Sequence, residues 1–127
     1  MPMQTTLLTA GLLGLIFIAL SIRVIKVRGS TKVMLGDGGD QTLLSRIRSH
    51  ANFAEYVPIL LILLGLVEYI NGTNTLVQAA GATIVVARLC HAIGMARPAP
   101  NLFRVIGMVG TFVPLVALSA WAVFLAV

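Results

Sequence analysis

The chain has 127 residues and a net charge of +5, with 58% hydrophobic and only 10% charged residues. Its mean hydropathy of +1.00 excludes a soluble globular protein, whose core has no use for so much apolar surface. The excess of positive charge does not indicate nucleic-acid binding, because no soluble module with a basic face and aromatic readers accompanies it. Cationic loops beside anionic membrane lipids account for the charge more simply.

Cysteine and metal chemistry are also disfavoured by the composition. The single cysteine, Cys90, excludes an internal disulfide or a thiol-based metal cluster, and we expect it to be a small packing residue. The two histidines lie on different predicted helices without further soft ligands nearby. We therefore expect no metal site.

The first apolar run, residues 7–27, is long enough to span a hydrocarbon core of about 30 Å. We expect it to be kept as a membrane span, because residues 1–6 carry none of the positive charge that precedes a cleaved signal peptide. Residues 29–42 follow as a loop rich in Gly, Ser, Thr and Asp. Within it, Asp37 or Asp40 is expected to cap a helix or to pair with an arginine.

Three further spans follow in chain order. Residues 57–70 form the second span, and residues 43–56 extend it as a polar helical segment without a helix breaker. Asparagines and a glycine at 71–74 predict a tight turn, beside which Glu68 and Tyr69 are expected to be solvated residues or interfacial anchors. Residues 76–95 and 105–127 are the third and fourth spans. The sequence thus predicts an all-α, integral membrane four-helix bundle that forms one domain over residues 1–127.

The charge distribution supports four spans and predicts their orientation. The first connection is flanked by six basic residues and the second by none, while three lie around the third connection. Basic residues concentrate on the cytoplasmic side, so connections one and three are expected in the cytoplasm and both termini outside. The short loops favour a bacterial inner membrane over the endoplasmic reticulum.

Polar residues within the spans are the candidate functional groups, because an unpartnered polar group in hydrocarbon is costly. Spacings of four and three place Arg48, Asn52 and Glu55 on one helical face. Arg88 and His91 share a face of the third span. Such a mixture suits a small zwitterionic or polyanionic ligand, since guanidinium groups bind carboxylates and a glutamate accepts from an ammonium group. The alternative is that Glu55 only neutralises Arg48 or Arg88 and thereby holds helices together.

These residues carry a family resemblance. The motif Arg48-x-His50-x-Asn52-x-x-Glu55-Tyr56-x-Pro58, followed by Val86-Ala87-Arg88-x-x-His91 and by Arg104, resembles the MAPEG family of membrane-associated proteins in eicosanoid and glutathione metabolism. The resemblance extends over nearly the whole chain. It implies a homotrimer that binds glutathione between neighbouring protomers and admits a lipophilic electrophile from the bilayer.

The resemblance also implies roles for single residues. Positions that match the family's glutathione contacts are Arg28, Arg48, Asn52, Glu55, Tyr56, Arg88 and His91, of which Arg28 is the looser match. Arg104 matches the arginine that holds the glutathione thiolate, and a nearby guanidinium favours the anion of a thiol whose pKa is near 8.5. Met95 departs from the family, because several members carry a tyrosine there. This departure weakens a specific assignment to prostaglandin or leukotriene synthesis.

Three functions follow from these observations. The first is a glutathione-dependent transferase or peroxidase that acts on a hydrophobic electrophile. The second is a non-catalytic lipid-binding scaffold of the same family, which loss of Arg104 or of the second-span motif would have favoured. The third, a small multidrug exporter, is disfavoured because that class needs a carboxylate in its first span and this one has none.

Overall fold

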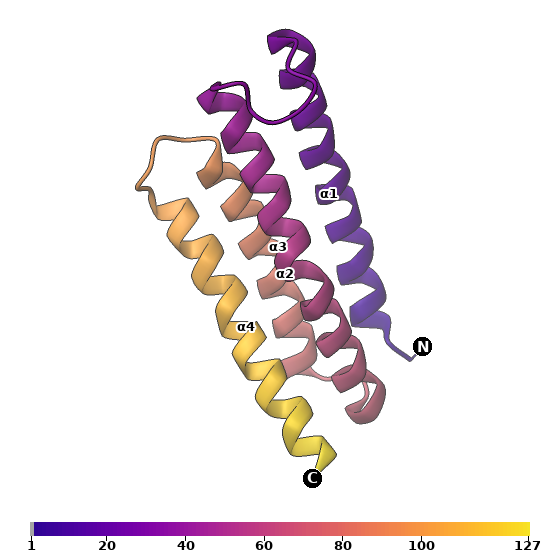
Figure 1. Ribbon diagram of the computed structural model, residues 1–127. Helices are drawn as coiled ribbons and strands as arrows, with labels where there is room; N and C mark the ends of the chain where they lie inside the picture. The colour runs from indigo at the N-terminus through magenta and orange to yellow at the C-terminus, as the bar shows by residue number, and fades with distance from the viewer. Residues whose placement is uncertain (1) are drawn as a thin grey trace.

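The computed structural model describes residues 2–127, which form four α-helices: α1 (Gln4–Thr31), α2 (Gln41–Asn71), α3 (Thr75–Met95) and α4 (Leu102–Ala126). The helices run alternately up and down (Figure 1). Both termini and the α2–α3 turn lie at one end of the bundle, which we call the terminal end. The other two connections lie at the opposite end, which we call the loop end. All four helices are long and apolar enough to cross a membrane, which confirms the predicted all-α, four-span fold.

Side-chain caps explain where three of the helices begin. Asp40 accepts a hydrogen bond from the backbone N–H of Leu43 at 2.7 Å and so caps α2, one of the two roles expected for it. Asn74 caps α3 in the same way, and Asn101 accepts from the N–H of Arg104 at 3.0 Å to cap α4. Each cap satisfies N–H groups that the first turn of a helix leaves free.

The first turn of α1 is capped from another helix. No side chain at its own N-cap accepts a hydrogen bond. Instead, the carboxylate of Glu68 on α2 accepts from the N–H groups of Thr5 and Thr6, at 2.9 and 2.7 Å. Glu68 is only 1% exposed, so the prediction that it is a solvated residue is wrong. Its charge suits this place because the N-terminus of a helix carries partial positive charge.

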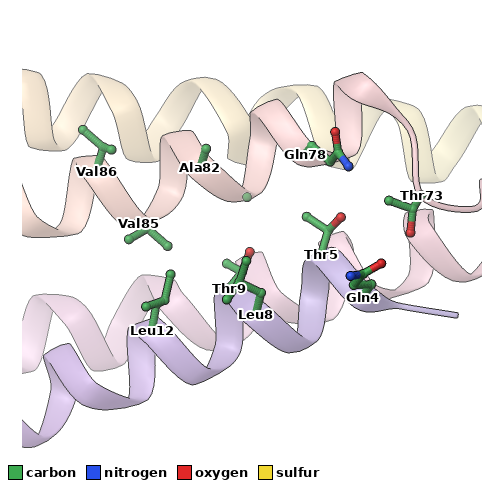
Figure 2. Close-up of a pocket in the computed structure, with 11 residues that line it drawn as sticks. Gln4, Thr5, Leu8, Thr9, Leu12, Thr73, Gln78, Ala82, Val85 and Val86 are labelled. Atoms are coloured by element: carbon green, nitrogen blue, oxygen red, sulfur yellow. The ribbon is translucent and has the colours of Figure 1, made fainter. Parts of the chain in front are cut away.

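The helices pack in a bundle in which α2 contacts the other three, whereas α1 and α4 make no contact with each other within the described residues. Aliphatic side chains fill the interior, among them Leu13, Leu60, Leu64, Ile84 and Leu118. Large apolar side chains also cover the outside, for example Leu8 and Phe124. Such a surface would aggregate in water but matches a hydrocarbon solvent. At the terminal end, α1 and α3 leave a groove between them (Figure 2).

Candidate functional site

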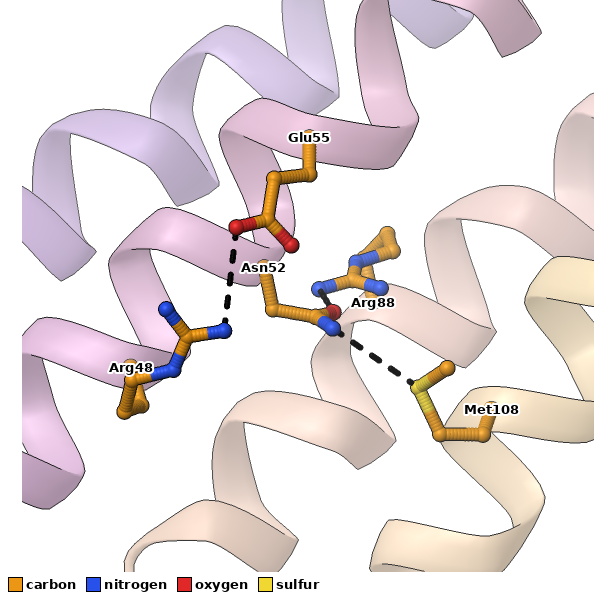
Figure 3. A network of polar contacts seen from close by, with 5 residues as sticks. All are labelled: Arg48, Asn52, Glu55, Arg88 and Met108. Carbon is orange, nitrogen blue, oxygen red and sulfur yellow. Dashed lines mark hydrogen bonds and ion pairs between the residues drawn. The ribbon is translucent and has the colours of Figure 1, made fainter.

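The second-span motif presents three polar side chains on one face of α2. Arg48, Asn52 and Glu55 point to the same side of the helix, with Asn52 between the two charged residues (Figure 3). Arg48 Nη2 lies 3.6 Å from Glu55 Oε1, and both side chains are 54% exposed. The predicted shared face is therefore present. Of the two ion pairs considered for Glu55, the described residues contain the one with Arg48.

Behind this face lies a buried guanidinium. Arg88 on α3 is 1% exposed, and its Nη2 donates to Asn52 Oδ1 at 2.8 Å. The same nitrogen lies 3.3 Å from His91 Nδ1, so the two α3 residues point together as their spacing predicts. Arg88 also lies over the ring of Phe53, 5.6 Å from its centroid. Within the described residues no carboxylate pairs with this cation, and its Nε has no hydrogen-bond partner.

Helix α4 completes this network with two residues that the sequence analysis did not single out. Arg88 Nη1 donates to Thr111 Oγ1 at 3.3 Å, and the Thr111 hydroxyl donates in turn to the Gly107 carbonyl at 2.7 Å. Met108 Sδ accepts from Asn52 Nδ2 at 4.0 Å. Met108 follows Arg104 by four residues and Thr111 follows Met108 by three, so both lie on the Arg104 face of α4. That periodicity was a signal available in the sequence.

A basic cleft of about 600 Å³ opens at the loop end, between the start of α2, the end of α3 and the start of α4. Four arginines line it: Arg46, Arg48, Arg97 and Arg104. No aspartate or glutamate of the described residues is part of the lining, so the cleft favours an anion. Arg48 therefore belongs both to the α2 face and to the cleft. Met95 also lines the cleft.

Close contact between α3 and α4 places Arg104 at the cleft. Gly94 leaves room for the backbone of Arg104, which the Cβ of any larger residue would meet. Asn101 donates to the Gly94 carbonyl at 2.9 Å while it caps α4. The Ser45 hydroxyl donates to the Met95 carbonyl and ties α2 to the end of α3. The first turn of α4 is thus fixed against α3, which is itself tied to the start of α2.

Two of the predicted site residues form no hydrogen bond or ion pair with this cluster within the described residues. Arg28 donates to the carbonyls of Val33 and Gly36, at 3.2 and 2.8 Å, and so organises the loop between α1 and α2. Tyr56 packs edge-on against Phe112 on α4, with ring centroids 5.5 Å apart. Neither residue lines the basic cleft.

The motif histidine on α2 has a packing role. His50 stacks on Phe17, with ring centroids 4.7 Å apart, and shares a hydrogen bond of 3.1 Å with the Ser21 hydroxyl. Both partners lie on α1, so His50 joins α1 to α2 on the side of α2 away from the Arg48 face.

The chain is similar to known proteins. The model of the MAPEG family matches residues 6–124, nearly the whole chain. The inner membrane protein YecN of Escherichia coli, in strain K12 and in strain O6:H1 (CFT073), is 38% identical over 88 residues. The match covers 68% of this chain and 66% of YecN, just under two thirds of that protein's length. No solved structure matches the chain.

These matches confirm the family and the location predicted from the sequence. Four membrane-length helices and an inner-membrane relative make the chain a multi-pass protein of the bacterial inner membrane. Which end faces the cytoplasm stays a prediction from the arginines and lysines of the loop end. The chain belongs to the MAPEG family.

Proposed function

We propose that the chain binds glutathione in the basic cleft and joins it, through its thiol sulfur, to a lipophilic electrophile. The observation that carries this proposal is the position of Arg48, which lines the cleft beside Arg104 and also pairs with Glu55. The cleft volume of about 600 Å³ lies within the range of small-molecule sites. Four arginines without a lining carboxylate suit a peptide that carries two carboxylates.

The charges of glutathione match the groups in and beside the cleft. The cleft arginines would bind its carboxylates, and Glu55 would accept hydrogen bonds from its ammonium group. Asn52 would face the peptide part, while Arg88, which lies beside His91, donates to the Asn52 side-chain oxygen from behind. Arg28 and Tyr56 would contribute only if a neighbouring copy presents them, as a homotrimer with the site between protomers would allow.

Arg104 is the residue we assign to the thiolate. Its guanidinium would stabilise the sulfur anion as the thiol releases its proton to water. The thiolate then forms a bond to an electrophilic carbon, whose leaving group departs with the bonding electron pair. Lowering the thiol pKa by one unit needs about 1.4 kcal/mol, which a single charge-assisted contact in a partly dry site supplies.

Calorimetry of detergent-purified protein with glutathione tests the binding step. We expect micromolar to millimolar affinity that Arg48→Ala and Glu55→Ala abolish. Lys32→Ala, which removes an exposed cation of the loop end that does not line the cleft, should bind as the parent does. Folded protein that binds no glutathione would remove the basis of the proposal and favour the lipid-binding scaffold.

Conjugation of glutathione to chlorodinitrobenzene tests the chemical step. Arg104→Ala should keep binding but lose about a hundredfold or more in kcat, since it removes stabilisation of the reacting anion. Arg104→Lys should recover part of that loss. Binding without turnover in the parent protein would contradict the transferase reading and leave a glutathione- or lipid-binding module.

A further inference from the structure

A second candidate ligand site lies at the terminal end, away from the basic cleft. It is the groove between α1 and α3, with a volume of about 440 Å³. Polar side chains gather at its mouth, where Gln4 and Gln78 lie on facing helices near Thr73 (Figure 2). Leu8, Leu12 and Val85 line the deeper part. The groove therefore changes from polar to apolar along its length, as an amphiphile does.

The groove holds hydrogen-bonding groups that residues 2–127 do not satisfy. The Thr9 side chain is 4% exposed and directs its hydroxyl toward α3, yet this hydroxyl forms no hydrogen bond within the described part of the chain (Figure 2). The absence of a side chain at Gly81 makes this position possible, since a Cβ there would lie 2.5 Å from Thr9 Oγ1. The amides of Gln4 and Gln78 are likewise free to bind a ligand.

The electrostatics of the groove select the class of ligand. No lysine, arginine, aspartate or glutamate lines it among the described residues. Glu68 does not line the groove, but its carboxylate accepts from the lining residue Thr73, at Oγ1, at 2.6 Å. A phosphate or carboxylate would find no cation here and would meet that negative charge. Ester carbonyls and hydroxyls suit the amide and threonine groups, and one acyl chain suits the leucines and valine.

We propose that this groove binds a neutral glyceride, with its glycerol ester at the Gln4–Gln78 mouth and one acyl chain along α1 and α3. The Thr9 hydroxyl forms a hydrogen bond with the ester or a glycerol hydroxyl. This site is independent of the glutathione proposal, because it lies at the other end of the bundle and shares no lining residue with the basic cleft.

Native mass spectrometry of the detergent-purified protein tests the site with two lipids of the same acyl chain. Monoolein is the neutral probe, and oleoyl lysophosphatidylglycerol is the anionic one. We expect at least about tenfold tighter retention of monoolein, the size of effect that one or two well-placed hydrogen bonds supply. Equal retention of both lipids would show only nonspecific lipid around the helices and would overturn the proposal.

Three variants localise the binding. Ala82→Phe fills the groove and should abolish retention, whereas Ala79→Phe, at an exposed α3 position outside the groove, should not. Thr9→Val keeps the side-chain shape without the hydroxyl and should weaken monoolein binding about tenfold. An Ala82→Phe protein that retains monoolein contradicts the proposal. Loss of an oligomer in the Ala82→Phe protein would also contradict the proposal, because it would mean that a second copy of the chain, and not a lipid, covers the groove.

Discussion

The Glu68 carboxylate accepts a hydrogen bond of 2.7 Å from the backbone N–H of Thr6, across 62 positions of sequence. The Thr6 hydroxyl donates to the same oxygen at 2.6 Å, and Thr5 N–H and Thr73 Oγ1 donate to the other. Four donors thus converge on one carboxylate that is almost fully buried. This single side chain joins the end of α2, the following turn and the start of α1.

Glu68→Ala should lower the free energy of unfolding by about 3 kcal/mol, because it leaves several donors without an acceptor. Glu68→Gln should lower the free energy of unfolding by less, because one side-chain oxygen remains as an acceptor. Some loss should remain, because the amide N–H groups of the glutamine face the other donors. Denaturation in mixed detergent micelles measures both. Tyr69→Phe, at the neighbouring exposed position, is the control and should leave stability unchanged. A Glu68→Ala protein as stable as the parent would show that the cap contributes nothing.

The Arg48–Glu55 pair should matter for binding much more than for stability. Its side chains are half exposed and 3.6 Å apart, so each alanine substitution should cost less than about 1 kcal/mol of folding free energy. The exchanged double variant Arg48→Glu/Glu55→Arg keeps an ion pair but moves the cation away from the cleft. We expect it to fold like the parent and to bind no glutathione in calorimetry. Binding that survives the exchange would mean that the pair is only structural.

Asn52 should stabilise the protein through Arg88. Asn52→Leu removes the acceptor at 2.8 Å from a buried guanidinium and should cost about 2 kcal/mol or more. Asn52→Asp keeps an acceptor at that place and should be at least as stable as the parent, because the buried cation gains an opposite charge. Unfolding midpoints of the two variants measure this order. The reverse order would mean that Asn52 does not balance Arg88.

Replacing a glycine by alanine should destabilise the bundle only where that glycine lies in a close contact between helices. A Cβ at Gly107 on α4 would lie 2.6 Å from backbone and side-chain atoms of His91 on α3, so Gly107→Ala should separate the two helices and destabilise the bundle. Gly11 on α1 has nothing within 4 Å, and Gly11→Ala should be neutral or slightly stabilising. Thermal unfolding in detergent compares them. Equal effects would contradict the close approach of α3 and α4 at Gly107.

Much of the fold could be predicted because membrane insertion is decided locally. The apolar run at 7–27 lies within α1, and the run at 57–70 with its polar extension became the single helix α2. Helical periodicity likewise predicted that Arg48, Asn52 and Glu55 share a face and that Arg88 points with His91. These relationships depend only on residues within a few turns of each other.

Other features depend on which helices meet. Glu68 was expected to be solvated because it follows an apolar run and precedes a polar turn, but the start of α1 packs over it and supplies its donors. Arg28 was grouped with the glutathione contacts, and that role stays a prediction; within the described residues it donates to the loop carbonyls of Val33 and Gly36. No local pattern reports such partners.

The sequence by itself determined the number of spans, the family and the helical faces on which the polar residues lie, since hydropathy, charge and periodicity act over short stretches of chain. Only the tertiary structure decided that Thr111 and Met108 complete the network around Arg88 and Asn52, and that Arg48 and Arg104 line one cleft. The physical reason is that a polar group in an apolar bundle takes whichever partner the packing of distant helices brings within hydrogen-bond reach.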